Sequence, residues 1–179
     1  MSTINNCLIV VDYQNDFVIG SLGFPGAVEI EQNIALKIEQ YRENGDVVVF
    51  TFDTHGEDYL ETQEGSKLPV KHCLRGTDGH KLYGQVSKLI NENDSVFYKN
   101  TFGSDVLYNY LKSNQFDTIE LVGLVSNICV ISNAVLAKTA QPEAHIIIDA
   151  KCTASYDMAL HQATLSVMKG LQMTVINED

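Results

Sequence analysis

Apolar residues gather in six short runs along the chain, with polar or amphipathic stretches between them. Each run is almost continuously apolar and rich in β-branched or aromatic residues. The runs cover residues 7–13, 47–52, 95–98, 118–124, 145–149 and 173–176. Runs of this kind are typical of strands that are buried on both faces of a parallel sheet. We therefore expect six parallel strands.

Segments with a helical spacing of apolar residues lie between most of these runs. They cover residues 28–44, 104–114, 126–140 and 156–170. Asn44-Gly45 and Gly170 end two of them, and Ser104 opens another, in agreement with known capping preferences. Strands that alternate with helices predict an open α/β fold with right-handed crossovers. We expect residues 1–179 to form a single domain, with a six-stranded parallel sheet and helices on both faces.

One long connection, residues 53–80, interrupts this alternation and is rich in Gly, Asp, Glu and His. Connections of this length inside a compact domain are uncommon and usually functional. Polar residues also follow four of the predicted strands, at the carboxyl ends where sites form in open parallel sheets. These residues are Asp12, Asp53 with His55, Lys99 and Cys129. We expect their side chains to face one crevice.

Composition describes an ordinary soluble globule, with 179 residues of which 45% are hydrophobic. No apolar run approaches the roughly 18 residues that a membrane span needs. The start, MSTINNCLIVVDYQ, lacks the basic segment and cleavage site of a signal peptide, so we expect the first strand of a cytoplasmic protein there. Cys7, Cys73, Cys129 and Cys152 are widely scattered, which argues against a disulfide framework or a thiolate zinc site.

The formal net charge of −11 limits the classes of partner. Nucleic acids and anionic membrane surfaces carry charge of the same sign, so the sequence argues against both. The charge also disfavours a strongly anionic substrate, because the twelve Lys and Arg residues do not cluster into a basic pocket.

Asp12, Lys99 and Cys129 together have the chemistry of an activated thiol. A free thiol is mostly protonated at neutral pH, so a carboxylate can take its proton, and an ammonium can hold that carboxylate in place. The first turn of a helix adds partial positive charge and N–H groups for an oxyanion. The alternative for each residue is structural: a small buried hydrophobe for Cys129, a turn cap for Asp12 and a solvated surface position for Lys99.

Carboxylates and imidazoles in the long connection have the chemistry of a metal site. Such ligands suit zinc, manganese or iron(II) and leave positions open for water or substrate. The candidates are Asp53, His55, Glu64 and His72, with Glu61 as a competitor for Glu64. A solvated acidic loop is the alternative. We expect surface or structural roles for His80, His145 and His161.

Five motifs distributed over nearly the whole chain carry a family resemblance. They are VVDYQNDF (10–17), DTH (53–55), HCLRGTDG (72–79), YKNTFGS (98–104) and GLVSNICV (123–130). Together they resemble the isochorismatase-like cysteine hydrolases and, within that family, the nicotinamidases. The last motif is the most specific, because it resembles the glycine-led turn into the family's nucleophilic cysteine. The resemblance also implies that the protein acts on a small-molecule amide substrate. It further implies a homo-oligomer.

The resemblance assigns a catalytic role to each of these three residues. Cys129 is the expected nucleophile, Asp12 the base and Lys99 the third catalytic member. A non-proline cis peptide is expected at Leu124–Val125, where it aims the Val125 and Cys129 N–H groups at the oxyanion. The implied reaction is hydrolysis of an amide through a thioester on the cysteine.

The resemblance also implies a cofactor and substrate contacts. A divalent metal, zinc first with manganese or iron as alternatives, is expected on Asp53, His55 and His72, with Glu64 as the fourth ligand. The residues expected to contact the substrate are Phe17, Leu68 and Leu124.

Two departures from the nicotinamidase pattern bear on the substrate. The chain has no tryptophan, and Leu68 stands where nicotinamidases commonly carry one shortly before the last histidine. Ser126-Asn127 stands where the family usually has Thr-Asp. Besides nicotinamide we therefore consider another small amide, such as an N-carbamoyl or ureido compound. The alternatives without this activity are an inactive scaffold and a receiver-like signalling module with Asp53 as its phosphate acceptor.

Overall fold

Six strands form one sheet in the order β3-β2-β1-β4-β5-β6, and each pair of neighbours is parallel. The strands are β1 (Asn6–Val11), β2 (Val47–Asp53), β3 (Ser95–Lys99), β4 (Thr118–Leu124), β5 (His145–Ala154) and β6 (Thr174–Ile176). This computed structural model describes residues 5–178. Residues 1–4 and 179, which the single-domain prediction also includes, lie outside the described part. The predicted six-stranded parallel sheet is confirmed.

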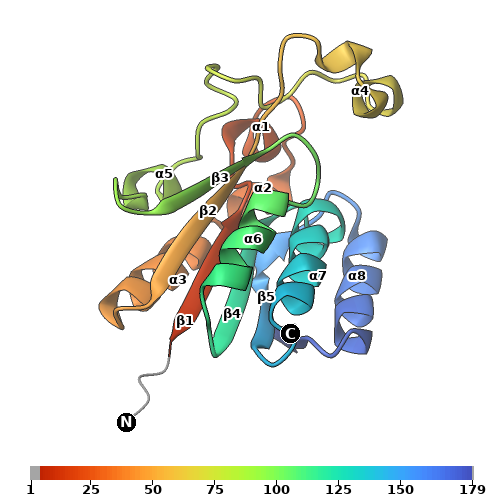
Figure 1. The fold of residues 1–179 in the computed structure, drawn as a ribbon. Helices are drawn as coiled ribbons and strands as arrows, with labels where there is room; N and C mark the ends of the chain where they lie inside the picture. The colour runs from red at the N-terminus through yellow and green to blue at the C-terminus, as the bar shows by residue number, and fades with distance from the viewer. Residues whose placement is uncertain (1–4, 179) are drawn as a thin grey trace.

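Helices cover both faces of this sheet (Figure 1). On one face lie α6 (Asp105–Ser113), α7 (Ile131–Ala140) and α8 (Met158–Gly170), and on the other lie α2 (Pro25–Glu29), α3 (Glu31–Glu43) and α5 (Val86–Leu89). Two short helices, α1 (Asn15–Val18) and α4 (Gln63–Lys67), belong to the loops at the carboxyl end of the strands (Figure 1).

Alternate side chains of β1 show why its sequence is apolar at every position. Cys7, Ile9 and Val11 pack in the layer of α6, α7 and α8, whereas Leu8 and Val10 pack in the layer of α3. All five side chains are fully buried. A central parallel strand with helices on both faces has no solvent side, so neither set of alternating positions is polar.

Two of the predicted helices each consist of two successive elements in the structure. The segment expected over 28–44 consists of α2 and α3, because Pro25 starts α2 at its first turn and Ile30 separates the two helices. The segment expected over 126–140 begins as a π-helical turn, η2 (Ser126–Val130), before α7. In that turn the Val130 N–H donates to the carbonyl of Val125, five residues earlier, at 3.2 Å.

β5 extends five residues beyond its predicted end. Its pairing with β4 is regular up to Leu121–Ile148 and resumes at Gly123–Thr153, so β5 carries extra residues between the two pairs. Gly123 is required in β4 at this point. Its φ is +110°, and a Cβ there would lie 2.0 Å from the Val11 carbonyl oxygen of β1. The close approach brings the carboxyl ends of β1 and β4 together.

The long connection over residues 53–80 lies above the carboxyl ends of the strands, as expected for a functional loop (Figure 1). It contains a 3₁₀ turn, η1 (Tyr59–Glu61), followed by α4. Within the described residues, the helices are too short or too polar to cross a membrane.

Candidate active site

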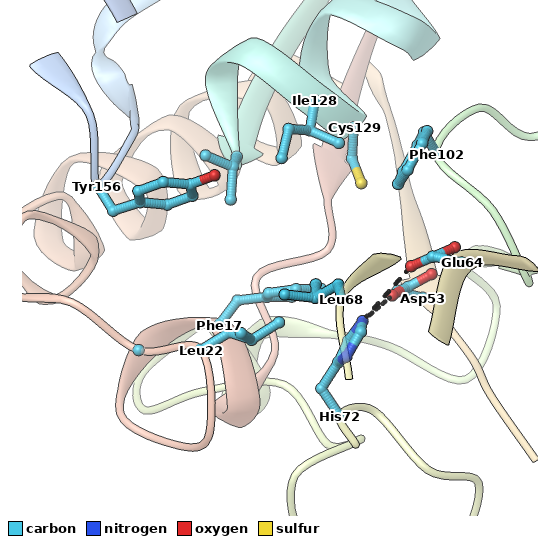
Figure 2. Close-up of a pocket in the computed structure, with 12 residues that line it drawn as sticks. Phe17, Leu22, Asp53, Glu64, Leu68, His72, Phe102, Ile128, Cys129 and Tyr156 are labelled. Carbon is cyan, nitrogen blue, oxygen red and sulfur yellow. Dashed lines mark ion pairs between the residues drawn. The ribbon is translucent and has the colours of Figure 1, made fainter. Parts of the chain in front are cut away.

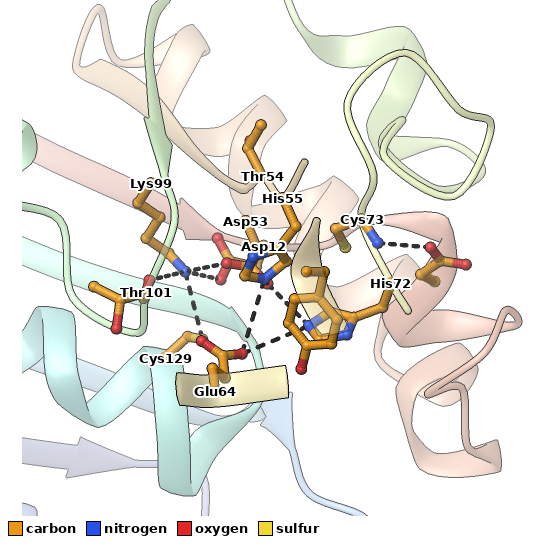
Figure 3. A network of polar contacts seen from close by, with 12 residues as sticks. Asp12, Asp53, Thr54, His55, Glu64, His72, Cys73, Lys99, Thr101 and Cys129 are labelled. Carbon is orange, nitrogen blue, oxygen red and sulfur yellow. Dashed lines mark hydrogen bonds and ion pairs between the residues drawn. The ribbon is translucent and has the colours of Figure 1, made fainter. Parts of the chain in front are cut away.

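At the carboxyl edge of the sheet, the predicted catalytic residues Asp12, Lys99 and Cys129 lie close together (Figure 3). Asp12 follows β1, Asp53 and Lys99 are the last residues of β2 and β3, and Cys129 lies in η2 after β4. The register of the β2–β3 pair places Asp53 and Lys99 directly beside each other. Three strand ends and one helical turn therefore converge on a single point.

Lys99 is the centre of this cluster. Its Nζ lies 2.6 Å from Asp12 Oδ2, 3.5 Å from Cys129 Sγ and 3.5 Å from Asp53 Oδ1. The same nitrogen donates to the Thr101 carbonyl at 3.0 Å. Lys99 and Cys129 are each 5% exposed, and Asp12 is fully buried. A solvated position for Lys99, the structural alternative, is therefore wrong.

Burial and charge act in opposite directions on these three groups. Burial disfavours the Lys99 cation, but the negative charges around it, that of Asp12 first, outweigh burial and raise the pKa of the amine. Burial raises the pKa of Asp12 despite the attraction of Lys99. Burial, with the repulsion of Asp12 and Asp53, also raises the pKa of the Cys129 thiol well above its usual value. The resting cysteine is therefore a neutral thiol that needs a base.

One oxygen of Asp12, Oδ1, is held by a hydrogen bond, whereas the other, Oδ2, remains able to accept a proton. Thr51 Oγ1 donates to Asp12 Oδ1 at 2.7 Å. Among the described residues, Oδ2 makes the close ion pair with Lys99 but accepts no well-aligned hydrogen bond. The backbone of Asp12 has a φ of +46°, a left-handed conformation that Asp adopts more readily than most residues.

The turn that carries Cys129 has the peptide geometry that the resemblance implied. The Leu124–Val125 bond is cis, and Val125 is not a proline. This confirms the expected position of the cis bond. π-helical turns such as η2 occur often at functional sites.

Asn133 joins the turn of Cys129 to the loop after β3. Its Nδ2 donates to the carbonyls of Cys129 at 2.8 Å and Phe102 at 3.1 Å, and its Oδ1 accepts from the Ser104 N–H at 3.0 Å. The side chain is fully buried. Sequence reasoning missed this residue, although its position four residues after Cys129 on a predicted helix was an available signal.

Asp53, His55 and His72 form a compact set of metal-ligand atoms. One ligand atom of each lies within 4.8 Å of the others, and all three residues are buried. His55 Nε2 and His72 Nε2 lie 3.0 Å and 3.3 Å from Asp53 Oδ2. His72 Nδ1 lies 2.8 Å from the Val70 carbonyl, which can only accept, so Nδ1 donates to it and Nε2, which faces Asp53, is the nitrogen that would bind a metal.

The donors of this set fit a divalent transition metal. Two imidazole nitrogens with one or two carboxylates suit zinc, manganese or iron(II), and leave positions for water or substrate. Burial would raise the pKa of Asp53, but hydrogen bonds from His55 and His72 and the charge of Lys99 hold it below the ordinary value. Asp53 is therefore an anion at neutral pH, as a metal ligand must be.

Glu64 is better placed than Glu61 to complete the metal set. Glu64 Oε1 lies 3.8 Å from His55 Nε2 and 3.9 Å from His72 Nε2, distances that leave room for an ion between them. Glu64 also lines the same cavity as Asp53 and His72, whereas Glu61 is exposed and does not line it.

The other three histidines have the surface or structural positions expected of them. His80 shares a hydrogen bond of 2.8 Å with Thr54 Oγ1, and His161 shares one of 2.8 Å with Ser126 Oγ. His145 is exposed at the start of β5.

A cavity of about 380 Å³ connects the sulfur of Cys129 with the metal-ligand set (Figure 2). Phe17 and Leu68 line it, as the resemblance implied. Leu124 does not line it, and the expectation of a substrate contact there is corrected. Leu124 is the last residue of β4, and its side chain is fully buried in the core layer of α3.

The cavity wall also contains apolar residues that the sequence reasoning missed. They are Leu22, Phe102, Ile128 and Tyr156, with Gly23 and Val125 beside them. Phe102 lies in the motif YKNTFGS and Ile128 next to Cys129, so local signals existed for these two. Leu22 and Tyr156 come from loops with no such signal, and only the fold brings them to the cavity.

Gln14 is a further residue of the site, and its side chain holds the backbone of Asp53 and His80 in place. Its Oε1 accepts from the Asp53 N–H at 2.8 Å, and its Nε2 donates to the carbonyls of Asp53 and His80, each at 2.9 Å. The side chain is fully buried. Gln14 thus fixes the end of β2 that presents Asp53, and its place in the motif VVDYQNDF was the available signal.

Comparison with known proteins places this geometry in a family. The model of the isochorismatase domain matches residues 6–179. The chain belongs to the isochorismatase family. A receiver-like signalling module, one of the alternatives considered above, is therefore excluded.

Members of this family with similar sequences and folds include amide hydrolases. An uncharacterised isochorismatase family protein of Bacillus subtilis is 30% identical over 89% of this chain and 91% of its own. The crystal structure of a Bacillus subtilis nicotinamidase superposes with a TM-score of 0.86 at 30% identity, covering 97% of this chain and 100% of that one. An N-carbamoylsarcosine amidase from Thermoplasma acidophilum has a TM-score of 0.80 at 25% identity, covering 98% of both chains.

Proposed function

We propose that this protein is a metal-assisted cysteine amidohydrolase, with nicotinamide as the best candidate substrate. The observation that carries the proposal is the cluster of Asp12, Lys99 and Cys129, joined by contacts of 2.6 Å and 3.5 Å. A cavity that also holds Asp53 and His72 opens directly onto this cluster. Family membership and the similarity to a nicotinamidase support the same activity.

Asp12 begins the reaction by taking the proton of the Cys129 thiol. Its raised pKa makes it a stronger base than an ordinary carboxylate, while the thiol is too weakly acidic to ionise alone. Lys99 stays protonated and stabilises the charges as they form. The sulfur then attacks the amide carbonyl carbon, and the carbonyl oxygen becomes an anion to which, by the family resemblance, the Val125 and Cys129 N–H groups donate hydrogen bonds.

Collapse of this tetrahedral adduct breaks the carbon–nitrogen bond. The leaving nitrogen takes the proton from Asp12 and departs as ammonia, and the acyl group remains on Cys129 as a thioester. Asp12 next removes a proton from water, and the resulting hydroxide attacks the thioester carbon. The carbon–sulfur bond breaks, the carboxylic acid leaves, and the sulfur recovers its proton.

The metal-ligand set faces the same cavity as the sulfur. Asp53, His55, His72 and Glu64 would hold a divalent ion, zinc in the first place and manganese or iron as alternatives, and a bound ion would supply a Lewis acid for a second polar atom such as a ring nitrogen. Phe17 and Leu68 contribute apolar walls for the ring between the two anchors.

An N-carbamoyl compound is the second candidate substrate. Leu68 gives the ring a smaller stacking surface than the tryptophan that the nicotinamidase pattern places there. The similarity to the N-carbamoylsarcosine amidase shows that this fold also serves a linear substrate.

Release of ammonia from a panel of amides tests the proposal. The protein is loaded with zinc, manganese or iron, its metal content is measured, and nicotinamide and N-carbamoylsarcosine are offered in parallel. We expect metal-dependent ammonia release with nicotinamide as the better substrate. If the protein prefers the carbamoyl compound, the proposed substrate is wrong, but the proposed mechanism stands. A metal-loaded protein that hydrolyses no amide contradicts both.

A further inference from the structure

The cavity extends well beyond the atoms that react. The sulfur of Cys129 and the carboxylates of Asp53 and Glu64 lie toward one end, and Tyr156 lies across the cavity from them (Figure 2). The part near Tyr156 is formed by the loop after α1, which provides Leu22, by η2 and by the loop before α8. Nothing in the proposed reaction uses this second end.

The size of the cavity exceeds what a one-ring amide needs. At the packing density of protein interiors, such a molecule fills on the order of 150 Å³. The cavity measures about 380 Å³, a volume in the range of pockets that bury larger ligands. With the amide carbon at the sulfur, the unfilled space lies toward Leu22, Ile128 and Tyr156.

The walls of this far end are apolar apart from the Tyr156 hydroxyl, which points into the cavity (Figure 2). Leu22, Val125 and Ile128 provide aliphatic surface, and Tyr156 provides an aromatic ring. The charged residues that line the cavity, Asp53 and Glu64 together with His72, belong to the other end (Figure 2).

Tyr156 combines an aromatic contact with much free surface. It is 64% exposed, and its ring packs edge-on against Phe24, with centroids 6.2 Å apart and planes at 81°. An apolar group placed against this ring would remove aromatic surface from water at little cost in side-chain freedom.

We propose that Leu22, Ile128 and Tyr156 form a substituent subsite, and that the substrate class is neutral ring carboxamides bearing an apolar group. The inference rests on the proposed amidohydrolase function. It adds a specificity determinant that is separate from the reacting groups.

The two anchors decide which ring atom carries this group. The carboxamide must reach Cys129, and the ring nitrogen must face Asp53 and His72, so both anchors lie at one end of the cavity. In nicotinamide these two positions flank one ring carbon, and the ring carbon opposite to it, C5, points away from both. A substituent on C5 is therefore the one that reaches Tyr156.

Steady-state kinetics on nicotinamide and its 5-methyl, 5-ethyl and 5-propyl derivatives test the subsite. Burial of each added methylene is expected to lower KM about threefold while kcat stays nearly constant. Tyr156→Ala and Leu22→Ala are expected to shrink the ratio of kcat/KM for 5-propyl over unsubstituted nicotinamide at least fivefold. Met158→Ala is the matched control, because Met158 is 62% exposed, lies two residues from Tyr156 and does not line the cavity. That variant should keep the ratio.

Two outcomes would overturn the subsite. One is a tenfold or greater loss of kcat/KM on adding the 5-methyl group, which means that the far end is closed to substrate. The other is an equal ratio in Tyr156→Ala and the unaltered protein. If the metal-loaded protein hydrolyses no amide, the proposed function fails, and calorimetric binding of the same four amides to metal-loaded Cys129→Ala still decides the subsite. Tighter binding of the longer substituents supports it, and equal or weaker binding contradicts it.

Discussion

Two lysines in this protein, the buried Lys99 and the half-buried Lys37, each lie between two carboxylates, yet only Lys99 belongs to the candidate active site. Lys99 Nζ lies 2.6 Å from Asp12 and 3.5 Å from Asp53. Lys37 Nζ lies 2.9 Å from Glu120 and 2.9 Å from Asp149, on the face of the sheet covered by α3. Charge pairing alone therefore does not distinguish a catalytic lysine from a structural one.

The second cluster even contains a cysteine. Cys152 and Lys37 line the same shallow recess of about 230 Å³, and burial raises the pKa of the Cys152 thiol, with Asp149 adding to the effect. Most other residues of that recess are polar, Asn33 and Gln40 among them. In the first cluster the lysine reaches the sulfur at 3.5 Å, and the sulfur faces a mostly apolar cavity that the candidate metal ligands Asp53, Glu64 and His72 also line. What separates the clusters is direct contact with the sulfur and space for a substrate.

Removal of each thiol in turn gives the largest expected difference between the clusters. Cys129→Ala should lower kcat by about 10⁴-fold or more, because no other group can form the thioester. Cys152→Ala removes a thiol of similar burial and should leave kcat within about twofold. Ammonia release measures both. Equal activity in Cys129→Ala and the unaltered protein would refute covalent catalysis.

Removal of each lysine's charge should separate catalysis from stability. Lys99→Met is expected to lower kcat about 10²-fold to 10⁴-fold, because Asp12 and the forming anion lose their counter-charge. Lys37→Met should keep kcat, since Lys37 lies outside the cavity. Activity is normalised to folded protein by circular dichroism. A comparable loss of kcat in both variants would mean that the charge acts on the fold and not on the reaction.

Lys37→Met should instead destabilise the protein. It leaves Glu120 and Asp149 without their cation, and the loss of one partner of a fully buried pair costs about 3–5 kcal/mol. The Lys37 side chain is 16% exposed, so solvent screens part of the charge and we expect about 2 kcal/mol. Urea unfolding at pH 7 measures the change. Lys37→Arg is the control that keeps the charge, and a loss as large as that of Lys37→Met would contradict the electrostatic explanation.

Acid should reduce this difference in stability, which is the smallest effect we expect. Burial would raise the pKa of Asp149, but hydrogen bonds from Lys37, Asn177 and the Lys151 N–H lower it below the ordinary value. The resulting stabilisation is fully present above about pH 4, the unfolded value, and is lost as the pH falls through the lower folded value. The gap in the free energy of unfolding between the unaltered protein and Lys37→Met should therefore narrow as the pH falls below about 4, as measured by urea unfolding. A constant gap would contradict it.

The sequence predicted the parts of this molecule that depend on local pattern. β1 is recognisable because both of its faces are buried, and Asp12, Asp53 and Lys99 could be placed at one edge because parallel strands share their direction. The motif around Cys129 indicated the nucleophile and the cis bond, but only through resemblance. These predictions needed no knowledge of which side chains touch.

The parts that depend on packing between distant segments were out of reach. Leu22 and Tyr156 meet at the cavity although 134 residues separate them. Lys37 finds Glu120 and Asp149 only after α3 has packed across β4 and β5. The direction of Leu124 likewise follows from the register of β4 and not from its neighbours in sequence. Such contacts are properties of the assembled sheet.

The position of β3 in the sheet has a consequence for how activity would be lost. β3 is an edge strand of five residues that pairs only with β2, and its last residue is the active-site amine. Strands with one neighbour are held by fewer hydrogen bonds and open at lower free energy than central strands such as β1. Partial detachment of β3 would carry the Lys99 ammonium away from the Cys129 sulfur while the helices and the inner strands remain folded. Under mildly denaturing conditions the enzyme is therefore expected to lose activity well before it unfolds.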